Sequence, residues 1–213
     1  GERWRAMWLD RLEHAVFFPE VWLTHPYRDD YWKHGSVCED YEAITCPVYA
    51  IGGWSDAYSN AIPRLLAGLK VPCKGLIGPW AHLYPHDGVP GPAIGFLQEA
   101  LRWWDQWLKG NDTGIMAEPV LRVWMQESVR PRPFHKQRTG RWVAETQWPS
   151  PRITLTRYWL NPDRLSSLST EETQIDFCSP QTTGLGAGEW CGFGAPGEAP
   201  PDQRPDDGCS LTF

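Results

Sequence analysis

Residues 46–82 constrain the fold more than any other part of the chain. Two short apolar runs, Val48–Ile51 and Gly75–Ile77, each end at glycine, as buried strands commonly do. Between them, apolar residues recur with the period of a helix that buries one face, namely Ile62, Leu65, Leu66 and Leu69. Strand, helix and strand in this order predict a βαβ unit, and therefore an α/β fold with parallel strands.

An acidic and a basic side chain follow the two predicted strands. Asp56 comes three residues after Gly53, and His82 comes four residues after Gly78. Because ligands gather at the carboxyl ends of parallel strands, we expect the two side chains to lie near each other. A carboxylate bound to imidazole Nδ1 fixes the tautomer in which Nε2 can take a proton from a hydroxyl nucleophile. The simpler alternative is a turn or N-cap aspartate and a surface histidine.

The nucleophile that such a pair would serve is harder to place. Gly53-Trp54-Ser55-Asp56-Ala57 resembles a nucleophile elbow between a strand and a helix. With Ser55 as nucleophile, however, the only acid between it and His82 in the order Ser, Asp, His would be the adjacent Asp56, which the elbow would turn away. The serine is therefore expected either outside this sequence or, less favourably, at Ser55.

Beyond residue 82 the pattern changes once more. Residues 96–108 predict an amphipathic helix, whereas residues 120–125, 142–143 and 153–160 are β-like and separated by turns. We therefore expect α/β plus β architecture, with a boundary near residue 117 and a β-sandwich after it. Residues 184–208, rich in Gly, Pro and Asp, are expected to form a long surface connection.

The ends of the chain suggest a piece of a longer protein. It starts at Gly1-Glu2 without an initiator Met and runs at once into a helical pattern over residues 3–17. The following residues 17–40 are aromatic and interrupted by prolines, which indicates a cap that covers a core or, as a less favoured alternative, a platform for a carbohydrate or aromatic ligand.

Composition narrows the classes of partner. Twenty Lys and Arg against 26 Asp and Glu leave a formal net charge of -6, without a basic run, so neither nucleic acid nor an anionic membrane is an expected partner. No apolar stretch approaches the length of a membrane span. The six cysteines lack metal-site spacing, so we expect no metal and no cofactor. The absence of paired cysteine motifs favours a reduced, cytoplasmic compartment. The sequence does not decide whether Cys178 and Cys191 form a disulfide or whether the protein is a homo-oligomer.

Residues 47–56, PVYAIGGWSD, and residues 77–82, IGPWAH, contain the predicted acid and base. They resemble the acid loop and the histidine loop of the X-Pro dipeptidyl-peptidase and cocaine-esterase-like (CocE/NonD) hydrolase family. Residues 104–110, WDQWLKG, are similar to its closing helix. The segments 140–142 and 148–149 are similar to the opening of its C-terminal jelly roll.

The resemblance implies a serine hydrolase that acts on esters, amides or X-Pro peptides through a Ser-Asp-His triad. Asp56 would be the acid and His82 the base, with the serine upstream of this sequence, so residues 1–213 alone would be inactive. Tyr58 would line the acyl pocket beside Trp54, where core packing is the alternative for both rings.

The same resemblance implies three parts: the end of a helical cap over residues 1–43, the C-terminal part of an α/β-hydrolase domain over 44–116, and an incomplete jelly-roll β-sandwich over 117–213. A different class of function, a non-catalytic β-sandwich module that binds carbohydrate or peptide, is the alternative hypothesis.

Overall fold

The computed structural model describes residues 1–162 and 164–213. It divides into two compact units, Gly1–Ala43 and Ile44–Phe213. The first unit contains only helical elements, namely α1 (Glu2–His14), α2 (Phe18–Thr24), α3 (Asp30–Lys33) and two 3-10 turns, Val37–Glu39 and Tyr41–Ala43. Asp29 caps α3 by accepting a hydrogen bond from the backbone N–H of Tyr31. The assignment of residues 1–43 to the end of a helical cap domain stays a prediction.

The predicted βαβ unit is confirmed. Strand β1 (Val48–Gly53) pairs in parallel with β2 (Cys73–Gly78), and α4 (Ala61–Gly68) connects them. The register aligns Gly53 with Gly78, so both strands end at the same level. The apolar face of α4 supplies Ile62 and Leu66 to a buried core with Ile77 and Leu121.

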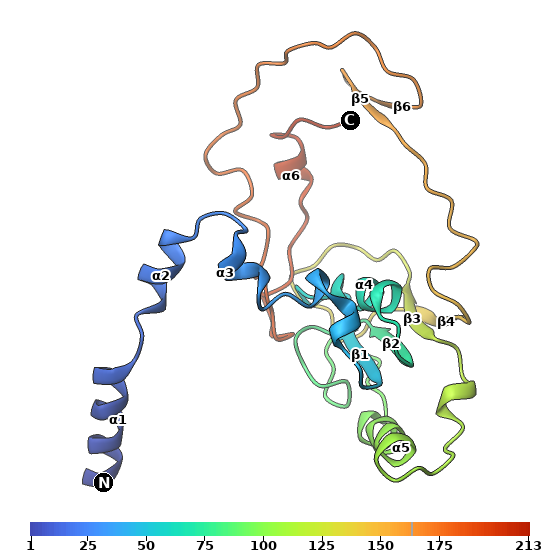
Figure 1. Ribbon diagram of the computed structural model, residues 1–213. Coiled ribbons are helices and arrows are strands. Elements are labelled where there is room, and N and C mark those ends of the chain that lie inside the picture. Colours follow the sequence, from blue (N-terminus) through green and yellow to red (C-terminus); the bar gives the residue numbers. More distant parts are fainter. Residues whose placement is uncertain (163) are drawn as a thin grey trace. The chain divides into compact units, whose positions relative to one another are not determined.

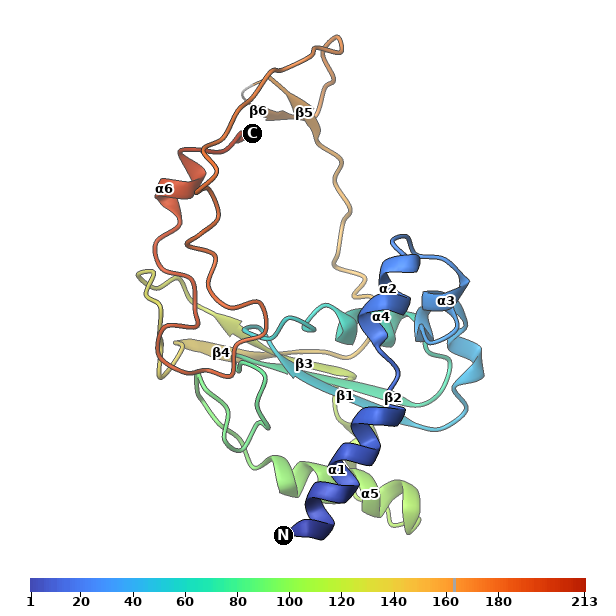
Figure 2. The ribbon, with the colours of Figure 1, turned by 90° about the vertical axis from the view of Figure 1, so that its left-hand side faces the viewer.

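A second helix lies on the opposite face of the sheet. Helix α5 (Phe96–Leu108) and α4 stand on either side of it in Figure 2. The rings of Tyr49 on β1 and Trp103 on α5 lie 5.3 Å apart. Beside them Arg122 forms an ion pair with Glu99 of α5 and donates a hydrogen bond to the Tyr49 hydroxyl. This partly buried polar cluster ties α5 to the sheet.

The sheet continues into the part of the chain that was expected to form a separate β-sandwich. After a 3-10 turn at Ile115–Ala117, β3 (Leu121–Gln126) pairs in parallel with β2, and β4 (Gly140–Glu145) pairs antiparallel with β3. The four strands lie in the order β1-β2-β3-β4. The prediction that these strands begin a separate β-sandwich is therefore wrong, and residue 117 does not separate two sheets. Residue pattern identifies a strand, but it carries no information about which strand will be its neighbour.

A second, smaller sheet follows. Strands β5 (Trp159–Asn161) and β6 (Arg164–Ser166) form an antiparallel pair, which makes the fold mixed α/β with a second antiparallel sheet. The strand predicted over residues 153–160 is wrong for 153–158, which have no regular structure. A jelly roll beyond the first sheet stays a prediction.

After β6 the chain forms a long, largely irregular segment, part of which comes back to the first sheet (Figure 1). It contains one short helix, α6 (Arg204–Asp207). The predicted surface connection over residues 184–208 is largely irregular, but its middle part contacts the end of the sheet: the Gly192 carbonyl accepts a hydrogen bond from the backbone N–H of His82 (3.0 Å).

Candidate active site

The loops that follow β1 and β2 are joined by their backbones. The N–H of Trp54 donates to the carbonyl of Gly78 (2.8 Å), and the N–H of Ser55 donates to the carbonyl of Trp80 (3.0 Å). Trp80 is fully buried, 0% exposed, and its indole N–H donates to the carbonyl of Pro92 (2.8 Å). A buried ring with a satisfied N–H holds its backbone in one place, so the two loops have a defined separation.

That separation brings Asp56 and His82 together. Nδ1 of His82 lies 2.9 Å from Oδ2 of Asp56. The other carboxylate oxygen, Oδ1, accepts the backbone N–H of Tyr58 at 3.0 Å. The Asp56 side chain is 13% exposed and that of His82 is 46% exposed. The carboxylate is thus fixed at both oxygens, and the imidazole is open to solvent.

The contact determines which nitrogen of His82 can act as a base. An ionised carboxylate only accepts hydrogen bonds, so the imidazole must carry its proton on Nδ1 to bind Asp56. Nε2 then holds a lone pair and is free to accept a proton. The expected proximity of the two side chains is therefore observed, while their catalytic role stays a prediction.

Ser55, the alternative nucleophile, points its hydroxyl elsewhere. Its Oγ donates a hydrogen bond to the carbonyl of Pro79 at 3.0 Å. A nucleophile that works with a histidine base must direct its proton to that base. The geometry thus favours the alternative in which the serine lies outside this sequence.

The two rings predicted to bind substrate lie beside the pair. Tyr58 is exposed, and its ring centroid is 6.1 Å from that of His82. Trp54 donates its indole N–H to the carbonyl of Trp124 on β3 (2.8 Å) and lines a cavity described below. Neither ring is buried as core packing would require. Their contact with substrate stays a prediction.

Sequence reasoning missed a third segment at this site. Trp190 packs edge-on against Tyr58 with centroids 5.5 Å apart, and Phe193 packs edge-on against His82 at 5.4 Å. These residues lie more than 100 positions after His82, in a stretch without helical or strand periodicity. The only local signal was the presence of two aromatic rings in a Gly-rich segment.

Cys191 comes with that segment and makes a three-residue cluster. Side-chain ligand atoms of Asp56, His82 and Cys191 all lie within 4.8 Å of one another. All six cysteines are free in the structure, including Cys178 and Cys191. Carboxylate, imidazole and thiolate are ligand types that Zn²⁺ accepts. The sequence predicted no metal, because no cysteine forms a C-x-x-C pair or has a histidine at zinc-site spacing.

Known proteins similar to this chain are hydrolases. A family model described as X-Pro dipeptidyl-peptidase (S15 family) matches residues 1–84, which include Asp56 and His82. A protein of Mycobacterium bovis named as a serine esterase is 30% identical over 142 residues, or 63% of this chain and 20% of its own length. Cocaine esterase of Rhodococcus sp. is 24% identical over 159 residues, or 70% of this chain and 26% of its own length.

A solved structure shares the fold. The crystal structure of a CocE/NonD family hydrolase from Staphylococcus aureus superposes with a TM-score of 0.51 at 16% identity, over 70% of this chain and 25% of that one. The chain therefore spans about a fifth to a quarter of the length of the relatives that it matches.

The chain is thus similar to proteins named as a serine esterase and a cocaine esterase. The family-model match over residues 1–84, the similarity to cocaine esterase and the shared fold support an assignment to the X-Pro dipeptidyl-peptidase and CocE/NonD hydrolase family. Among the described residues, no helix is both long enough and apolar enough to cross a bilayer.

Proposed function

We propose that the protein to which residues 1–213 belong is a serine hydrolase in which Asp56 is the acid and His82 the base of a Ser-Asp-His triad. The observation that carries the proposal is the 2.9 Å contact between His82 Nδ1 and Asp56 Oδ2 at the ends of two adjacent parallel strands. The names of the relatives, serine esterase and cocaine esterase, support it. Residues 44–116 would then be the closing part of an α/β-hydrolase domain.

In this mechanism His82 Nε2 takes the proton of a serine hydroxyl as the oxygen attacks the substrate carbonyl. Asp56 stabilises the imidazolium that forms, because its negatively charged Oδ2 accepts a hydrogen bond from Nδ1–H throughout. The same histidine then returns the proton to the leaving group, and water releases the acyl group in a second cycle. Esters, amides and X-Pro peptides share this chemistry, so the proposed substrates are acyl compounds of these classes.

The serine of the proposed triad lies outside residues 1–213. The orientation of Ser55 Oγ toward the Pro79 carbonyl supports this assignment. We therefore expect the isolated chain to show no rapid labelling by a fluorophosphonate probe, whereas the longer protein should be labelled at a serine upstream of residue 1. Labelling of the isolated chain at Ser55 would overturn this part of the proposal.

Replacement of the base is the direct test. In the longer protein, His82→Ala should lower kcat for p-nitrophenyl acetate by roughly 10³-fold or more, because it removes the general base. His86→Ala is the matched control, because His86 lies in the same loop and pairs with Asp87 instead of Asp56. That variant should keep its activity within about threefold. Equal activity of the His82→Ala and His86→Ala proteins would refute the proposal.

The orienting acid is tested in the same assay. Asp56→Asn keeps the shape of the side chain but places an uncharged amide where the carboxylate accepts the hydrogen bond of Nδ1–H. We expect kcat to fall by about 10³ to 10⁴-fold. An unchanged kcat would assign Asp56 to the turn alone, where its Oδ1 binds the N–H of Tyr58.

A further inference from the structure

A cavity of about 440 Å³ opens beside the acid–base pair. Its wall includes Ser55 and Ala81, the immediate chain neighbours of Asp56 and His82. The opposite parts of the wall come from the loop between β3 and β4 and from residues 189–201. This volume suits a small organic molecule.

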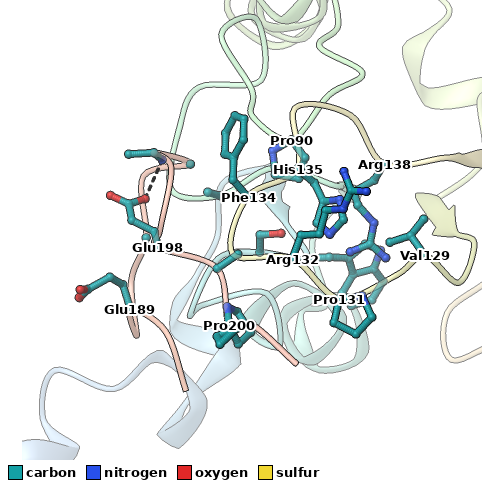
Figure 3. A pocket seen from close by; sticks show the side chains of 18 of the residues that line it. Pro90, Val129, Pro131, Arg132, Phe134, His135, Arg138, Glu189, Glu198 and Pro200 are labelled. Atoms are coloured by element: carbon teal, nitrogen blue, oxygen red, sulfur yellow. Dashed lines mark hydrogen bonds between the residues drawn. The ribbon is translucent and has the colours of Figure 1, made fainter. Parts of the chain in front are cut away.

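Two arginines and a histidine lie on one side of the cavity. Figure 3 shows Arg132, His135 and Arg138 there, with Glu189 and Glu198 on the other side. Among the described residues neither arginine forms an ion pair with a carboxylate. Burial lowers the pKa of His135, and the nearby guanidinium groups of Arg138 and Arg132 lower it further.

Two buried donors in this wall lack an acceptor. Nε of Arg138 and Nε2 of Gln126 are inaccessible to solvent and form no hydrogen bond within the described part of the chain. A buried N–H without a partner costs free energy, and most buried polar groups in proteins are satisfied. These two donors belong to residues that line the cavity, and each would gain a hydrogen bond from an acceptor that reached it.

The backbone holds Arg138 firmly in place. Its N–H donates to the carbonyl of Gly91 (2.9 Å), and its carbonyl accepts the indole N–H of Trp124 (3.2 Å). Across the cavity, Glu198 is already engaged by the backbone N–H of Ala195 (2.8 Å). The backbone of Arg138 is thus held on one side of the cavity, and one of the two acidic groups is held by its own loop.

We propose that this cavity binds the carboxylate of a small organic acid, with Arg138 and Gln126 as buried donors and Arg132 as a second cation. A guanidinium matches the planar, two-oxygen geometry of a carboxylate, and its charge strengthens each hydrogen bond. The apolar side chains of Val129, Phe134 and Pro131 line the same space and would contact the organic part of the ligand.

The position of the cavity suggests a substrate class for the site. Because the cavity borders both loops of the acid–base pair, its ligand would be an ester or amide that carries a free carboxylate, or the acid released from it. This assignment of a substrate class rests on the proposed function, whereas the proposed binding of a carboxylate in the cavity does not.

Calorimetric titration of residues 1–213 with phenylacetate tests the binding directly and needs no turnover. Phenylacetamide, which has the same shape without the charge, should bind at least about tenfold more weakly, because charged hydrogen bonds are the stronger ones. Inorganic phosphate distinguishes a site for organic acids from a general anion site. Tighter binding of phosphate than of phenylacetate would overturn the proposal.

Substitutions locate the site. Arg138→Gln should weaken phenylacetate binding at least about tenfold, and Arg132→Gln by several-fold. Arg64→Gln is the matched control, because Arg64 is an exposed arginine on α4 that does not line the cavity. Should Arg138→Gln fail to fold, as judged by circular dichroism, the exposed Arg132 decides the outcome. Binding by the Arg132→Gln protein equal to that of the Arg64→Gln protein would overturn the proposal.

Discussion

Gly53, the last residue of β1, is the position at which a single methyl group should do most damage to the candidate site. A Cβ atom at this residue would lie 1.9 Å from the carbonyl oxygen of Trp80. Ordinary contact begins at 3.4 Å. Because the obstacle is backbone and not a flexible side chain, Gly53→Ala must push the Asp56 loop away from the His82 loop.

The expected cost has two parts. Overpacking of a buried position costs about 1 to 3 kcal/mol. The displaced Trp80 carbonyl also loses its hydrogen bond from the Ser55 N–H, which is worth about 1 kcal/mol. We therefore expect the free energy of unfolding to fall by about 2 to 4 kcal/mol, and Tm to fall by about 5 to 15 °C for a chain of this size.

Urea denaturation followed by circular dichroism measures the loss, with Gly35→Ala as the control. A Cβ at Gly35 would meet no atom within 4 Å, so the free energy of unfolding of that variant should change by less than about 1 kcal/mol. Hydrogen exchange supplies the local measurement, because the amide of Ser55 should lose its protection in Gly53→Ala. Equal stability of the two variants, with Ser55 still protected, would refute the close approach on which the site geometry rests.

Two other substitutions test how the site is supported. Trp80→Phe should lower the free energy of unfolding by about 1 to 3 kcal/mol in urea titrations, because it leaves the Pro92 carbonyl without its indole donor and shrinks a fully buried ring; an unchanged midpoint would contradict this. Burial raises the pKa of Tyr49 above its ordinary value of 10.0, against the opposing effect of Arg122. The stability that this raised pKa contributes is complete below pH 10 and is lost as the pH rises through the folded-state pKa. The stability difference between the native protein and Tyr49→Phe should therefore shrink above pH 10, and a constant difference would exclude the linkage.

The central part of the fold followed from local pattern. Apolar runs over 48–51 and 75–77, with a helical period between them, placed β1, α4 and β2 close to where the structure has them. The β-like segments 120–125 and 142–143 lie in strands β3 and β4, but they belong to the first sheet and not to a separate one. Periodicity reports which face of an element is buried, and pairing depends on contacts that no local pattern encodes.

The sequence by itself determined that an acidic and a basic side chain follow two neighbouring parallel strands. Parallel strands of equal register bring their following loops to one edge, so Asp56 and His82 could be expected to meet before any coordinates were known. The tertiary structure decided the rest of the site: the close approach of Gly53 to Trp80, the return of residues 189–201, and the convergence of Gln126, Arg132 and Arg138 on one cavity. Those residues come from loops without periodicity, and their meeting depends on where the chain turns back, which only the folded molecule specifies.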